Sequence, residues 1–187
     1  IPVGYDVSCT PSLILSHEPE KKGEVPENWK LVPQFTMTDG KANALLDVPA
    51  GTSLYGGGEV TGPLLRNGQK IKMWNTDNGM YRVDGGSRLY QTHPWVLGVR
   101  SDGTAFGVLF DSFWKAELIT NSDKIEFNTE GAPFRTYIID RESPQAVLKG
   151  LAELTGTISM PPRWAIGYHQ SRFSYVPEAR VKEVANT

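Results

Sequence analysis

The sequence predicts a mainly β protein, in which a β-sandwich precedes a linker helix and the first βα unit of a truncated (β/α)8 barrel. About eight to ten short strand-like runs follow one another between turn residues, which is the spacing typical of a sandwich. A capped amphipathic pattern then begins at Ser143, and a short apolar run follows Pro161-Pro162. We expect the sandwich to span residues 1–142, the linker residues 143–160, and the start of the barrel residues 161–187.

Composition limits the classes of partner. The 187 residues are 39% hydrophobic and 21% charged, with a formal net charge of −2. This balance gives no electrostatic footprint for nucleic acid, and no apolar run approaches the roughly 20 residues that cross a bilayer. Cys9 is the single cysteine, so no internal disulfide can form. The cysteine content therefore does not indicate whether the protein belongs to an oxidising or a reducing compartment. Because His17, His93 and His169 lack the spacing of metal ligands, we expect no metal and no cofactor.

The strand-like runs are separated by recognisable turn residues. An edge strand is expected within residues 1–14, and two strand pieces flank Pro33 before the Asp39-Gly40 turn. Three consecutive glycines, Gly56 to Gly58, predict a tight bend or bulge, because no Gly-Lys-Ser/Thr follows to make a phosphate loop. The predicted strands are Trp29–Val32, Gln34–Thr38, Ala44–Val48, Lys70–Trp74, Gln91–Arg100, Ala105–Asp111, Trp114–Ile119, Lys124–Asn128 and Phe134–Ile139.

The C-terminal third changes character. Ser143-Pro144 has the residues of a helix N-cap and first turn, and Gly156 occupies the C-cap position. The run Trp164–Tyr168 is apolar and strand-forming, as a buried parallel strand would be, and a polar cluster follows it. A second helical pattern begins at Pro177 and stops at Thr187 without a cap, from which we expect a truncated chain.

Five segments, in this order, resemble motifs of glycoside hydrolase family 31, the α-glucosidase and α-xylosidase family. Residues 54–59 are similar to its YGLGE element, residues 73–77 to WNTD, and residues 90–94 to the start of YGSHPFYL. Residues 107–112 resemble its GVFLDNS strand, and residues 161–175 resemble PPRWALGYHQCRWSY.

The resemblance implies both a fold and an activity. The fold is a galactose-mutarotase-like sandwich packed against a catalytic barrel, and the activity is retaining hydrolysis of α-linked glucosides and oligosaccharides. In that mechanism two carboxyl groups about 5–5.5 Å apart act as nucleophile and acid/base. The family carries both on later barrel strands, so we expect no catalytic residue before Thr187 and no activity from this chain alone.

The resemblance also implies four substrate-binding residues. Asp77 matches an aspartate on a sandwich loop that hydrogen-bonds a sugar hydroxyl, and a carboxylate suits this role because charge-assisted bonds are strong. The alternative is that Asp77 caps the turn with Asn78-Gly79. Phe173 stands where many members have tryptophan, as a wall beside the sugar; the alternative is a core aromatic.

His169 and Arg172 complete the set. His169 follows the predicted barrel strand and could donate to substrate or to a neighbouring carboxylate; the alternative, more common for a histidine at a strand end, is a satisfied structural group. Arg172 could pair with an active-site aspartate and keep it ionised.

The other carboxylates (Glu59, Asp84, Asp111 and Asp140) are scattered, and their spacing pairs no two of them as acid and nucleophile.

Other interpretations stay open. A stand-alone carbohydrate-binding sandwich could stack sugars on Trp29, Trp74, Trp95 or Trp114. Within the family, an α-xylosidase, α-galactosidase or α-glucan lyase uses the same scaffold, because fold does not settle chemistry. The apolar run Trp164–Tyr168 would lack its barrel neighbours here, so we also expect the chain to self-associate.

Overall fold

The computed structural model describes residues 14–15, 29–77, 89–171 and 174–187. They form ten strands, two α-helices and one short 3-10 helix. The chain groups into two compact units, residues 1–156 and residues 157–187. The first unit contains all the strands and the first helix.

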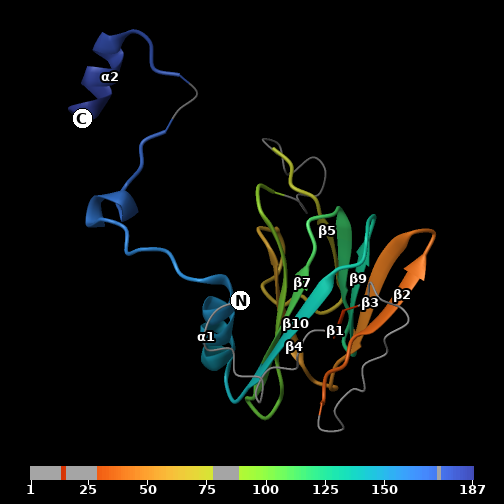
Figure 1. Cartoon of the computed structure of the whole chain (residues 1–187). Coiled ribbons are helices and arrows are strands. Elements are labelled where there is room, and N and C mark those ends of the chain that lie inside the picture. The colour runs from red at the N-terminus through yellow and green to blue at the C-terminus, as the bar shows by residue number, and fades with distance from the viewer. Residues whose placement is uncertain (1–13, 16–28, 78–88, 172–173) are drawn as a thin grey trace. The chain divides into compact units, whose positions relative to one another are not determined.

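Two antiparallel five-stranded sheets make up the first unit (Figure 1). One sheet has the order β1-β10-β7-β6-β4 and the other β2-β3-β9-β8-β5. The strands of the first sheet are β1 (Ile14–Leu15), β4 (Ser53–Gly58), β6 (Thr92–Val99), β7 (Ala105–Asp111) and β10 (Arg135–Arg141). The strands of the second are β2 (Gln34–Thr38), β3 (Lys41–Asp47), β5 (Gln69–Met73), β8 (Ala116–Thr120) and β9 (Lys124–Thr129). The predicted β-sandwich is therefore confirmed.

Most strand predictions hold. The strands β2 and β7 have the predicted bounds, and the other predicted strands from β3 onward are displaced by one to three residues at their ends. The prediction of a strand over Trp29–Val32 is wrong: these residues pair with no described strand, although Leu31 is buried. Of the predicted edge strand within residues 1–14, only Ile14 lies inside the described residues, where it begins β1.

The core lies between the sheets and follows from strand alternation. Buried and partly buried positions alternate along the whole of β9, because successive side chains of a strand point to opposite faces. Phe127 of β9 stacks on Phe110 of β7 with ring centroids 4.5 Å apart, and Phe134 meets both rings edge-on. Aromatic pairs in these geometries stabilise beyond their buried area.

The three glycines at the end of β4 form the predicted bulge. Gly56, Gly57 and Gly58 have φ angles of +121°, +85° and +88°, and the pairing of β4 with β6 shifts register between Gly56 and Gly58. A Cβ on Gly56 would lie 2.3 Å from the carbonyl oxygen of Trp95, and one on Gly58 would lie 2.6 Å from the nitrogen of His93. Glycine is therefore required here both for its backbone conformation and for the close approach of β6.

A buried arginine holds the loop that follows the bulge. Arg66 is 8% exposed, and its guanidinium donates to the carbonyl oxygens of Pro63 at 2.7 Å, Gly56 at 3.2 Å and Val60 at 3.3 Å. The next residue, Asn67, accepts from the backbone nitrogen of Leu54 at 2.8 Å. Buried polar groups persist only when hydrogen-bonded, so these contacts fix the loop against β4.

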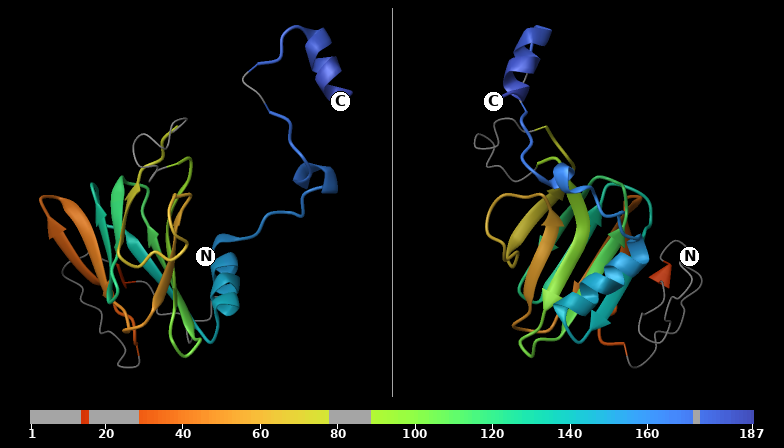
Figure 2. Two further views of the ribbon diagram at one scale, coloured as in Figure 1. Left: turned by 180° about the vertical axis from the view of Figure 1, so that it is seen from behind. Right: turned by 90° about the vertical axis from the view of Figure 1, so that its left-hand side faces the viewer.

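Helix α1 (Pro144–Thr155) forms as predicted. The Ser143 side chain accepts from the backbone nitrogen of Ala146 at 3.2 Å, which is an N-cap hydrogen bond. The helix lies against the outer face of the sheet over β10 and β7, with Val147 fully buried (Figure 2). The next residue, Leu148, is 50% exposed. The role of α1 as a linker to a barrel stays a prediction.

Residues 164–168 do not form the predicted strand. Residues Arg163–Ile166 make a 3-10 helix, and Trp164, Ile166 and Tyr168 are 80%, 71% and 89% exposed. The physical reason is that an isolated strand leaves its backbone groups unpaired, whereas a 3-10 turn closes its own hydrogen bonds. Those bonds run from Ala165 N to Pro162 O at 2.9 Å and from Gly167 N to Trp164 O at 3.3 Å.

Helix α2 (Glu178–Ala185) confirms the helical pattern after Pro177. It has no buried residue, and the ion pairs Lys182–Glu178 and Arg180–Glu183 lie on its surface. No helix in the described part of the chain is long and apolar enough to cross a membrane.

We expect Gly56→Ala to destabilise the sandwich by about 3 kcal/mol, because it adds a backbone clash to a positive φ angle. Gly51→Ala is the matched control: its φ is +78° but nothing lies within 4 Å of the added Cβ, so it should cost only about 1–2 kcal/mol. Denaturant unfolding measures both. Equal losses for the two variants would contradict the close approach of Trp95.

Candidate functional site

Four loops meet at one end of the sandwich because of strand register. Gly58 of β4 pairs with Thr92 of β6, so the residues after β4 lie beside those before β6. Met73 of β5 pairs with Ala116 of β8, so Trp74 lies beside the residues that precede β8. Those residues follow the end of β7, which runs antiparallel to β6. The four segments with sequence motifs before residue 113 thus converge although they are far apart in the chain.

A cluster of two carboxylates and a phenol occupies part of this end. The backbone nitrogen of Glu59 donates to the carbonyl of Gln91 at 2.9 Å, and Oε2 of Glu59 accepts from the nitrogen of Tyr90 at 3.0 Å. The nitrogen of Thr76 donates to the carbonyl of Leu89 at 3.0 Å. These bonds place Asp77, the predicted sugar ligand, next to the Tyr90 side chain.

The neighbouring charges change the acidity of Tyr90. The pKa of the Tyr90 phenol is raised above its ordinary value, first by the negative charge of Asp77, then by partial burial, a hydrogen bond with Asp77 and the charge of Glu59. The phenol, which is protonated at neutral pH in any case, therefore stays protonated to a more alkaline pH beside the Asp77 carboxylate. The stabilising effect of this proton is complete below about pH 10 and decreases as the pH rises through the raised pKa.

This arrangement orients an exposed acceptor. Asp77 is exposed and has two carboxylate oxygens, one of which the Tyr90 hydroxyl can occupy. The other lone pairs face solvent and can accept from ligand hydroxyls. The alternative prediction, that Asp77 caps a turn with Asn78-Gly79, lies outside the described residues.

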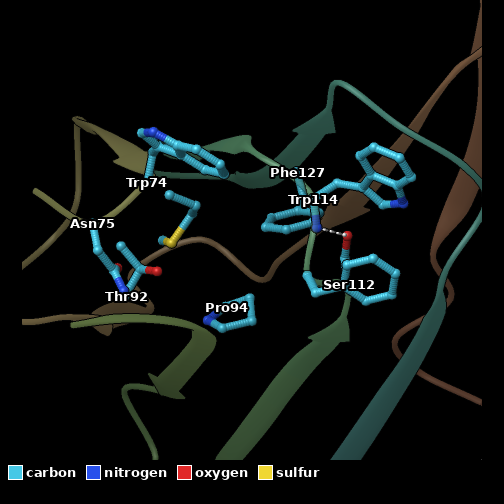
Figure 3. Close-up of a pocket in the computed structure, with 9 residues that line it drawn as sticks. Trp74, Asn75, Thr92, Pro94, Ser112, Trp114 and Phe127 are labelled. Carbon is cyan, nitrogen blue, oxygen red and sulfur yellow. Dashed lines mark hydrogen bonds between the residues drawn. The ribbon is translucent and has the colours of Figure 1, made fainter.

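A pocket of about 350 Å³ opens beside the cluster (Figure 3). Figure 3 shows Trp74 and Pro94 on opposite sides of it, with the ring of Phe127 at one end. Its lining residues are Met73, Trp74, Asn75, Thr92, Pro94, Ser112, Phe113, Trp114 and Phe127. None of these side chains is ionisable, so the pocket itself is neutral.

Trp114, one of the predicted stacking candidates, turns its indole away from Trp74 (Figure 3). It packs on Gly131, where a Cβ would lie 2.1 Å from the indole Cδ2. Trp95, another candidate, packs on Gly107 in the same manner and belongs to the sheet structure. Trp74, at 51% exposed, is the candidate that presents its ring to the pocket.

The other predicted site residues belong to the second unit. His169 is exposed, and its Nε2 lies 2.8 Å from the carbonyl oxygen of Ala165. Arg172 and Phe173 lie outside the described residues. Asp77 belongs to the first unit, and its meeting with the other three in one site stays a prediction.

Of the other carboxylates considered from the sequence, Asp140 makes a two-pronged ion pair with Arg100, at 2.9 and 3.0 Å. Asp84 lies outside the described residues. Within the described ranges, no three His, Cys, Asp or Glu side chains are grouped so as to hold a metal ion. Tyr90 was not predicted as a partner of Asp77. The available signal was its place at the start of the motif segment that comes after the Asp77 segment in the chain.

The chain matches the model of a protein family, and the similar proteins named below are glycosidases. Residues 13–118 match the glycosyl hydrolase 31 N-terminal galactose mutarotase-like domain. α-Glucosidase 2 of Bacillus thermoamyloliquefaciens is 41% identical over 71% of this chain and 17% of its own length. α-Xylosidase XylQ of Lactiplantibacillus pentosus is 30% identical over 78% of this chain and 19% of its own. The chain thus spans under a fifth of these relatives.

A solved structure is similar in fold and sequence. The family 31 α-glucosidase from Bacteroides thetaiotaomicron superposes with a TM-score of 0.71 at 68% identity, covering 81% of this chain and 26% of the α-glucosidase. The relatives are α-glycosidases, and the matched region lies in one domain of a larger protein.

We expect Asp77→Asn to lower the pKa of Tyr90, because the Asp77 charge is the largest cause of its elevation. Glu59→Gln should lower it less, because the Glu59 charge is the smallest of the causes. NMR titration of ¹³C-labelled tyrosine at alkaline pH measures both changes. A larger effect of the Glu59 variant would show that the phenol faces Glu59 instead.

Proposed function

The chain belongs to glycosyl hydrolase family 31 as its N-terminal galactose mutarotase-like domain, and on this premise we propose that it is part of a retaining α-glycoside hydrolase acting on α-linked glucosides and oligosaccharides. The domain supports a catalytic barrel and lends the loop of Asp77 to the substrate pocket. The nucleophile and the acid/base belong to later barrel strands, outside these 187 residues. The chain by itself then has no hydrolytic activity.

The observation that carries this proposal is the position of Asp77. Its carboxylate is exposed at the end of the sandwich where four loops meet, and Tyr90 holds it from one side. A carboxylate can accept from two vicinal sugar hydroxyls, and charge-assisted hydrogen bonds are the stronger kind. The free oxygen lone pairs of Asp77 supply that acceptor.

The second unit has a matching role in this proposal. A catalytic barrel in the parent protein covers the exposed side chains of Trp164, Ile166 and Tyr168, which stand on and beside the 3-10 helix. Loops after the strands of such barrels face the active site, so His169, Arg172 and Phe173 come to the substrate there. An α-xylosidase parent is the second candidate, because XylQ matches 78% of this chain.

Asp77→Ala in the full-length parent should lower kcat/KM for an α-linked disaccharide by roughly 10- to 100-fold, which is the loss expected for one hydrogen bond to a charged group. Steady-state kinetics on maltose and isomaltose measures it. Asp123→Ala is the matched control, because Asp123 is also exposed but lies at the opposite end of β8. Unchanged kcat/KM and aglycone preference in the Asp77 variant would remove the loop from the substrate site.

We also propose that the chain self-associates through its second unit. Within this unit large apolar side chains are more than two-thirds exposed: Ile158, Met160, Trp164, Ile166, Tyr168 and Val176. Exposed apolar surface of this kind recruits a partner. In sedimentation velocity the sedimentation coefficient should rise with protein concentration. The double substitution Trp164→Ser and Ile166→Ser should abolish this rise. A monomer at all concentrations would contradict the proposal.

A further inference from the structure

The neutral pocket beside Asp77 has the size and composition of a ligand site. Its volume of about 350 Å³ falls within the range of about 300–1,000 Å³ common for small-molecule sites. Such sites combine apolar walls with a few polar groups that orient the ligand. The Asp77 role proposed above uses none of the residues that line this pocket.

One wall of the pocket is aromatic and accessible. Trp74 follows the last residue of β5, Met73, which is 5% exposed and fixes the backbone at this point. The Trp74 side chain is nevertheless 51% exposed, and Phe113 beside the pocket is 89% exposed. An indole with one free face offers an apolar surface for stacking at a low cost in conformational entropy.

Other parts of the lining offer unused hydrogen-bonding groups. Among the described residues, the side chains of Asn75 and Thr92 make no hydrogen bond. Ser112 Oγ accepts one long bond, 3.4 Å, from the nitrogen of Trp114. An amide and two hydroxyls can both donate and accept, as the hydroxyl groups of a ligand require.

We propose that this pocket is a second subsite, which binds one neutral pyranose ring of an α-linked oligosaccharide through stacking on Trp74 and hydrogen bonds to Asn75, Thr92 and Ser112. A sugar ring has an apolar face and a rim of hydroxyls, and this matches both kinds of lining. The lack of ionisable groups in the pocket argues against a phosphate or a carboxylate ligand. The inference rests on the proposed function, because the saccharide that it places in the pocket is the proposed substrate. Asn75 stands two residues before Asp77 on the same loop, so one oligosaccharide can reach both.

A covering apolar segment of the parent protein fits the pocket less well. Burial under apolar side chains would leave the Asn75 amide and the Thr92 hydroxyl without partners, and each unpaired group costs about 1–3 kcal/mol. Sugar hydroxyls satisfy these groups instead. The polar part of the lining therefore favours a saccharide over a protein segment.

The test uses the 187-residue chain labelled with ¹⁵N and titrated with maltotriose and isomaltotriose. We expect the indole N–H signal of Trp74 to shift in a saturable manner, and Trp74→Ala to weaken binding about tenfold. Asn75→Ala, which keeps the indole, should weaken it as well. Met37→Ala is the matched control, because Met37 on β2 is a similarly exposed apolar side chain that does not line the pocket and should leave affinity unchanged.

The outcomes separate this inference from the proposed function. A Trp74 signal that does not shift, or binding that survives both pocket variants, overturns the subsite even if the full-length parent hydrolyses α-glucosides. Saturable binding at Trp74 combined with a full-length parent that cleaves no α-glycoside would retain the subsite and overturn the hydrolase.

Discussion

The glycine bulge at the end of β4 is the constraint on which the candidate site depends. Gly56 to Gly58 have positive φ angles, and at Gly56 and Gly58 the β4 backbone lies in close contact with β6. The bulge that they form shifts the pairing register between β4 and β6. This shift brings Glu59 to the backbone of Tyr90 and Gln91, and Tyr90 in turn meets Asp77. A side chain at Gly56 or Gly58 would clash with the backbone of β6, and the chain of contacts to Asp77 would be lost.

Among the described residues of the sandwich, an aromatic ring packs directly on a glycine at three places. The Phe106, Trp95 and Trp114 rings lie where a Cβ on Gly98, Gly107 and Gly131 respectively would be within 2.2 Å. Each ring lies on the backbone of a glycine and fills the space that a side chain there would occupy. This contact fixes the position of the ring. For Trp114 this packing holds the indole against Gly131 and turned away from Trp74, although the residue also lines the neutral pocket (Figure 3). Trp74 lacks such a contact with any glycine that the structure describes, and it is 51% exposed.

Local sequence patterns predicted most of the sandwich, because each strand alternates and each turn carries its own residues. The strands β2 and β7, the bulge and the cap at Ser143 depend on neighbours in the chain and were predicted correctly. The strand over residues 164–168 was predicted wrongly because a strand depends on partners that the local pattern does not supply. The Tyr90–Asp77 contact and the neutral pocket were missed for a related reason: both depend on register between distant segments. Motif resemblance made Asp77 a candidate ligand but gave no indication that Tyr90 lies beside it.

Charge divides the end of the sandwich into two regions with different ligand chemistry. Glu59, Asp77 and Tyr90 form an ionisable region, in which a carboxylate is oriented toward solvent. Asn75 and Thr92 belong to a neutral region that begins two residues from Asp77 along the loop. A carboxylate forms strong directional bonds with hydroxyls, whereas a neutral pocket with an aromatic wall binds mainly through surface contact and tolerates different linkages. A saccharide that spans both regions would be oriented at Asp77 and would gain affinity at Trp74, so the two substitutions should affect different properties of the bound sugar.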